Sequence, residues 1–92
     1  MSGIDESSKP RVGRAFRLQW EPAQSAHVLL YPEGMVQLNG SAGAILSRCD
    51  GVRTWSSIVE DLERTFETSG LAADVLAFAA VALEKGLLEV GE

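Results

Sequence analysis

The stretch HVLLYPEGMVQLN, residues 27–39, decides the fold. His27–Tyr31 is mostly apolar and is typical of a strand. Pro32-Glu33-Gly34 predicts a turn, because proline presets φ at the first turn position and glycine accepts the positive φ that follows a type I turn. Met35–Asn39 then returns as a second strand, so the stretch predicts a β-hairpin.

The residues before the hairpin predict one more strand. Phe16, Leu18 and Trp20 alternate with polar residues, and Pro22 ends the pattern because proline cannot donate to a ladder. Three successive strands favour an antiparallel meander. Residues 1–14 are polar and lack periodicity, so we expect a flexible N-terminal tail at 1–14 and a single domain at 15–92.

The residues after the hairpin predict three helices, since the apolar spacing changes to i, i+3, i+4, i+7. Ser41 is a candidate N-cap of the first helix, which Gly51 closes, and Thr54 is a candidate N-cap of the second. The third helix is expected from Leu71 to Lys85, with Gly86 after it and then a short tail or a strand fragment. The order β-β-β-α-α-α predicts an α+β, winged-helix-like fold.

Composition limits the classes of function. The 92 residues are 46% hydrophobic and 23% charged, as in an ordinary globular domain. The longest apolar run, Val75–Leu83, is far shorter than the roughly 18 residues of a membrane span. Residues 21–92 carry four basic and eleven acidic residues, so nucleic acid is a poor partner. A single cysteine fits a reducing cytoplasm.

The residues that could support catalysis are few. The chain has one histidine, His27, and one cysteine, Cys49, which lies on the apolar stripe of the first predicted helix. One of each cannot complete a zinc site, and no phosphate-binding glycine motif is present. We expect Cys49 to be a core residue and His27 a strand residue. The sequence therefore predicts no catalytic residue, no metal and no cofactor, and a protein that is not an enzyme.

Two features predict a binding surface. The strand Met35–Asn39 has no charge and no proline, so as a sheet edge it can pair with another chain. The third helix carries a second apolar stripe, Leu76, Ala80 and Leu83, about 100° from its core face. This stripe either packs inside the fold or lines a groove for a partner. The candidate peptide-binding residues are Met35, Val36, Gln37, Leu38, Asn39, Leu76, Ala80 and Leu83.

The segments RLQWEPAQ, VLLYPEGMVQLN, AGAIL and CDGVRT follow one another between residues 17 and 54, and GLLEV closes the chain. Together with Asp74, Val75 and Phe78 they resemble the PqqD family of pyrroloquinoline quinone (PQQ) biosynthesis. The resemblance covers roughly residues 10–90. It implies a peptide chaperone that binds the ribosomal precursor peptide and presents it to a radical S-adenosylmethionine enzyme, which cross-links a Glu and a Tyr of the peptide.

The resemblance also implies where the peptide binds. Related domains, the RiPP recognition elements, are winged-helix-like and take a leader peptide as an extra strand. That strand pairs with the third strand, and the third helix forms the other wall, which here implies Met35–Asn39 and the predicted helix from Leu71 to Lys85. The resemblance fixes these elements only, and Leu76, Ala80 and Leu83 are the wall candidates that periodicity selects.

Other roles stay open from the sequence. Arg53 has no evident local role, and two hypotheses are open for it: it binds the carboxylates of a neighbouring element, or it binds those of the partner enzyme. The same edge and stripe also fit a homodimer. A winged-helix DNA-binding regulator is disfavoured, because the second predicted helix is acidic and Val75–Leu83 has no charge.

Overall fold

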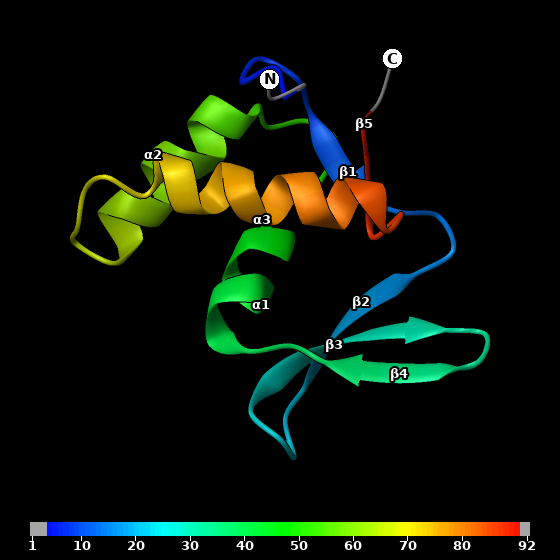
Figure 1. The fold of residues 1–92 in the computed structure, drawn as a ribbon. Helices are drawn as coiled ribbons and strands as arrows, with labels where there is room; N and C mark the ends of the chain where they lie inside the picture. The colour runs from blue at the N-terminus through cyan, green and yellow to red at the C-terminus, as the bar shows by residue number, and fades with distance from the viewer. Residues whose placement is uncertain (1–3, 91–92) are drawn as a thin grey trace.

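The computed structural model describes residues 4–90. Figure 1 shows the helices beside a small sheet, with further short strands near the two chain ends. The elements in chain order are β1 (Pro10–Val12), β2 (Arg17–Glu21), β3 (Ala26–Tyr31), β4 (Gly34–Gln37), α1 (Gly40–Leu46), α2 (Trp55–Thr65), α3 (Ala72–Glu84) and β5 (Leu88–Val90).

The predicted meander is confirmed. β2, β3 and β4 form an antiparallel sheet in that order, with Leu18 opposite Leu29 and Leu29 opposite Val36. Tyr31 pairs with Gly34, so Pro32 and Glu33 form a two-residue loop. The positive φ expected at Gly34 is absent, because Gly34 belongs to the closing pair of the hairpin. The expected α+β fold, with three strands followed by three helices, is thus observed.

The junction between β4 and α1 differs from the expectation. β4 ends at Gln37, two residues before the predicted end. The side-chain oxygen of Asn39 accepts a hydrogen bond from the Ala42 N–H at 2.7 Å, so Asn39 caps α1 in place of Ser41. Asn39 keeps an extended backbone, but its carbonyl accepts a hydrogen bond from the Gly43 N–H at 2.9 Å, so it serves the helix and not the sheet. Gly51, expected to close the helix, lies beyond its end and holds a turn at φ +80°.

The other helix boundaries follow the sequence signals. Thr54 Oγ1 accepts a hydrogen bond from the Ser57 N–H at 3.1 Å and caps α2 as predicted. α3 is followed by Gly86 at φ +76°, the left-handed geometry of a helix end. Strand β5 confirms the predicted fragment after α3.

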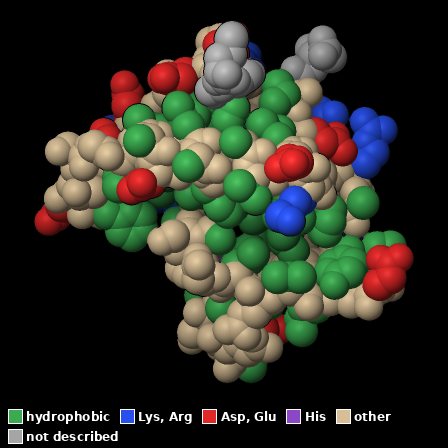
Figure 2. Space-filling model, in the orientation of Figure 1, with side chains coloured by type: hydrophobic (Ala, Val, Ile, Leu, Met, Phe, Trp, Pro, Cys, Tyr) green, Lys and Arg blue, Asp and Glu red, His purple; other side chains and the backbone are tan. Residues whose placement is uncertain are grey.

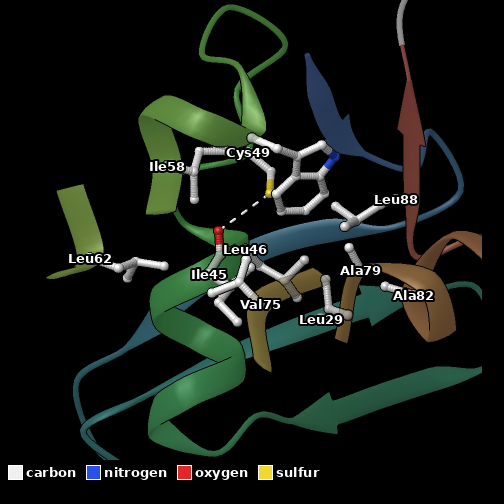
Figure 3. Packing of buried hydrophobic residues seen from close by; sticks show 11 residues of the cluster. Leu29, Ile45, Leu46, Cys49, Ile58, Leu62, Val75, Ala79, Ala82 and Leu88 are labelled. Atoms are coloured by element: carbon white, nitrogen blue, oxygen red, sulfur yellow. Dashed lines mark hydrogen bonds between the residues drawn. The ribbon is translucent and has the colours of Figure 1, made fainter. Parts of the chain in front are cut away.

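One hydrophobic core joins the helices to the sheet (Figure 3). Its buried members are Leu29, Ile45, Leu46, Cys49, Trp55, Ile58, Leu62, Val75, Ala79, Ala82 and Leu88. The Cys49 thiol donates to the Ile45 carbonyl oxygen at 3.3 Å. Burial raises the pKa of this thiol to about 12, and the negative charge of Asp50 adds to the effect. The prediction that Cys49 is a core residue is confirmed.

The structure corrects the expected tail at residues 1–14. Pro10–Val12 form β1, which pairs antiparallel with β5 so that Pro10 lies opposite Val90. The Ser8 carbonyl also accepts a hydrogen bond from the Trp55 N–H at 3.1 Å. These contacts join the segment to elements more than forty residues away in the sequence, so no local sequence pattern predicts them. Residues 1–3 lie outside the described residues.

Candidate functional site

β4 is an edge strand whose second side has no partner within residues 4–90. The sheet order places β3 on one side of it only, and its four residues are all exposed. Figure 1 shows the β3–β4 hairpin at the border of the molecule, with α3 lying across from it. Such an edge presents unpaired backbone groups to solvent.

The register shows which backbone groups point outward. The Leu38 N–H donates to the His27 carbonyl at 2.9 Å, so these two residues form a hydrogen-bonded pair. In antiparallel strands such pairs alternate, which makes Val36 and Gly34 the next residues bonded to β3. The N–H and C=O groups of Met35 and Gln37 therefore face away from the sheet. An added strand finds two donors and two acceptors there.

The side chains of β4 also alternate. Val36 lies beside Leu29, on the face of the sheet that packs on the helices, and is 44% exposed. Leu38 lies on the same face and packs partly against the core. Met35 and Gln37 project from the opposite face. The helix-facing side of the edge is thus apolar, and it is incompletely covered.

A pocket of about 590 Å³ adjoins the end of β4. It lies between the first turn of α1, the end of α2 and the start of α3. Its lining residues are Asn39, Gly40, Ser41, Ala42, Ala44, Ile45, Leu62, Phe66, Thr68, Leu71, Asp74, Val75 and Phe78. Figure 2, in the orientation of Figure 1, shows hydrophobic side chains between α3 and the hairpin. The pocket lining begins at Asn39, two residues after the edge strand ends at Gln37.

The stripe predicted from periodicity lies elsewhere on α3. Leu76 and Leu83 are half-buried against the core, Ala80 is exposed, and none of the three lines the pocket. At 100° per residue, Leu76 and Phe78 lie about 160° apart around the helix axis. Phe78 is half-buried against the core and also lines the pocket. The pocket flank at the start of α3 consists of Leu71, Asp74 and Phe78. Its one signal in the sequence is the spacing of Asp74 and Phe78, which are about one helical turn apart.

Arg53 pairs with carboxylates of a neighbouring element, one of the two alternatives that the sequence left open. Its guanidinium lies 3.6 Å from the Asp61 carboxylate on α2 and 3.8 Å from that of Asp50. Asp61 also accepts hydrogen bonds from Arg48 at 2.6 Å and from Arg64 at 3.2 Å. These bonds lower the pKa of Asp61, with the Arg48 bond the largest cause. Arg53 therefore belongs to an ion-pair network that ties the α1–α2 loop to α2.

The two residues with nucleophile or base chemistry have separate packing roles. The His27 ring contacts the Trp20 ring edge-on at a centroid distance of 5.0 Å, whereas the buried Cys49 thiol bonds to its own helix. Within residues 4–90 the His, Cys, Asp and Glu side chains form no group of three suited to a metal ion. None of the helices in that range is long and apolar enough to cross a membrane.

Comparison with known proteins places this edge and pocket in a known family. The model of the family described as coenzyme PQQ synthesis protein D (PqqD) matches residues 26–88, from β3 to β5. The chain belongs to the PqqD family. That range holds β4, α1 and α3, so every element of the edge and pocket lies inside the match.

Individual relatives are similar over nearly the full chain. The PqqA binding protein of Stutzerimonas stutzeri is 50% identical over 91 residues, which cover 98% of this chain and 99% of the relative. That of Azotobacter vinelandii is 54% identical with the same coverage. A solution structure of the PqqD part of Methylobacterium extorquens PqqCD, described as a stand-alone RiPP recognition element, is 33% identical. It superposes with a TM-score of 0.75 over 96% of each chain.

Proposed function

We propose that this protein is a peptide-binding adaptor of PQQ biosynthesis that takes the PqqA precursor peptide as an added strand on β4. The relatives named for PqqA binding support the ligand. The observation that carries the binding mode is the outward orientation of the Met35 and Gln37 peptide groups, which follows from the Leu38–His27 hydrogen bond. Main-chain pairing of this kind gives affinity, and alternate side-chain pockets give selectivity.

The peptide lies, in this proposal, along Met35–Asn39. Every second side chain of the added strand faces the helices beside Val36, since side chains alternate across a strand. For the opposite wall two flanks of α3 compete. The stripe predicted from the sequence is Leu76, Ala80 and Leu83; the flank that lines the pocket is Leu71, Asp74 and Phe78. We favour the pocket flank, because it adjoins Asn39 at the end of the edge strand.

The role we propose is presentation rather than catalysis. The adaptor holds the precursor peptide for the radical S-adenosylmethionine enzyme that cross-links it, and so raises the local peptide concentration at that enzyme. It works in the cytoplasm, without a cofactor or metal of its own. Arg53 is 44% exposed in its ion-pair network and remains the proposed contact to the enzyme. A homodimer that pairs through the same edge competes with peptide binding.

Titration of ¹⁵N-labelled protein with PqqA peptide tests this function. We expect saturable amide shifts at Met35–Asn39, together with shifts on α3. Shifts at Phe78 and Asp74 support the pocket flank, whereas shifts confined to Leu76, Ala80 and Leu83 support the sequence-predicted stripe.

Absence of shifts at near-millimolar peptide contradicts the proposal when a sizing run shows a monomer. If the sizing run shows a dimer, the titration is repeated on a dilute sample that is monomeric, and the same rule applies there. Shifts that spare β4 altogether also contradict strand addition.

A further inference from the structure

We infer that Asp74 selects a peptide in which a lysine or arginine neighbours an apolar side chain, the apolar group entering the pocket and the cation pairing with the Asp74 carboxylate. The inference rests on the proposed peptide binding and adds the chemistry of the bound segment. It is carried by the lining of the pocket and by the charges around its mouth.

The pocket is built for an apolar group. Ile45, Leu62 and Val75 form buried parts of its lining, and Phe78 covers one flank. Phe66 is 56% exposed although it is large and apolar. Covering it with an apolar ligand group removes its surface from water, at about 25 cal/mol for each Å² buried.

The pocket is continuous with the peptide-binding edge. Asn39 follows β4, caps α1 and contributes to the pocket lining, and Gly40 and Ser41 continue that lining. A strand added to Met35 and Gln37 therefore reaches the mouth of the pocket as it passes the end of β4. A Cβ on Gly40 would meet no atom within 4 Å, so this stretch of the approach is open.

The charge at the mouth is negative and unbalanced. Asp74 is the single ionisable residue among the lining residues, and within residues 4–90 it has no ion-pair partner. Glu63 lies at the same end of α3, where its carboxylate accepts a hydrogen bond from the Leu71 N–H at 3.0 Å. Arg48, just after α1, and Arg64 on α2 are bound to Asp61.

A cation must therefore come from the ligand if Asp74 is to be paired. A second copy of this chain that pairs β4 with β4 does not supply one, because Gly34–Gln37 carries no charge. An acidic segment meets repulsion at the same place. A peptide with a basic residue beside an apolar one satisfies both the pocket and the carboxylate.

Isothermal titration with matched variants tests this inference. Asp74→Asn is compared with Glu84→Gln, a carboxylate of the same helix outside the pocket, and with Asp74→Glu, which keeps the charge. The probes are PqqA peptide and variants in which each Lys or Arg in turn is replaced by Gln. We expect Asp74→Asn to weaken binding of the native peptide about two- to fivefold at low salt, the range of an exposed ion pair. Glu84→Gln is expected to bind as wild type.

One peptide variant lacks the cation that pairs with Asp74, and this variant should bind wild type and Asp74→Asn with equal affinity. An equal loss for every peptide variant overturns the inference, and so does unchanged affinity of Asp74→Asn. Methyl spectra of the wild-type protein at saturation give a second readout: unshifted Ile45, Leu62 and Val75 overturn pocket occupancy. A wild-type protein that binds none of the peptides instead overturns the proposed function itself.

Discussion

Proline at position 37 separates peptide binding from folding. The Gln37 N–H faces away from the sheet, because Leu38 and Val36 hold the bonds to β3. Gln37→Pro therefore removes a donor to the peptide without removing a bond of the hairpin. Proline is tolerated on edge strands when its nitrogen faces solvent. Residue 36 keeps its extended backbone, which is the conformation that a following proline favours.

The expected size of the effect follows from the lost bond. A peptide carbonyl left without its donor costs about 1–3 kcal/mol, which corresponds to about a 5- to 150-fold weaker Kd. The proline ring also occupies the space where the added strand approaches. The matched control is Gln37→Ala, which removes the same side chain and keeps the N–H, and it should bind within a few-fold of wild type.

Val36→Pro is the contrasting variant. Its N–H belongs to the pair with Leu29, so proline there breaks the hairpin and lowers stability as well as binding. Binding is measured by isothermal titration with PqqA peptide, and folding by thermal unfolding of each variant. If Gln37→Pro binds as tightly as Gln37→Ala while both remain folded, the peptide does not pair with this edge.

Two further predictions concern the fold. Gly13→Ala should lower the free energy of unfolding by about 1–3 kcal/mol or more, because its Cβ would collide with the Gly86 carbonyl oxygen. The control is Gly40→Ala, whose Cβ meets open space and whose unfolding temperature should be unchanged or slightly higher. Equal changes of unfolding temperature in the two variants would contradict the packing of residues 10–13. The pKa of the Cys49 thiol is raised from 9.0 to about 12 in the folded protein. Between about pH 9 and 12 only the unfolded chain therefore releases the thiol proton, and wild type should lose stability relative to Cys49→Ala at about 1.4 kcal/mol per pH unit. Denaturant unfolding at several pH values measures this difference, and parallel pH curves for the two proteins would disprove the burial of the thiol.

Local patterns were sufficient for the parts of the fold whose determinants lie close together in the chain. The hairpin follows from two apolar runs around Pro32 and Glu33, and the start of α2 follows from the Thr54 side chain bonding three residues ahead. The burial of Cys49 follows from its place on an apolar stripe. The uncharged edge Met35–Gln37 is likewise a local property, and the sheet order then left it free.

Tertiary structure decided the features whose partners are distant in sequence. β1 forms only because β5 supplies its ladder, and Arg53 is held by Asp61, which belongs to the following helix. The side of α3 that lines the pocket depends on how the helix is rotated over the core, and periodicity alone selected Leu76, Ala80 and Leu83, none of which lines the pocket. Hydrophobic spacing records which face of an element is apolar, but the neighbour of each face is set by packing of all elements at once.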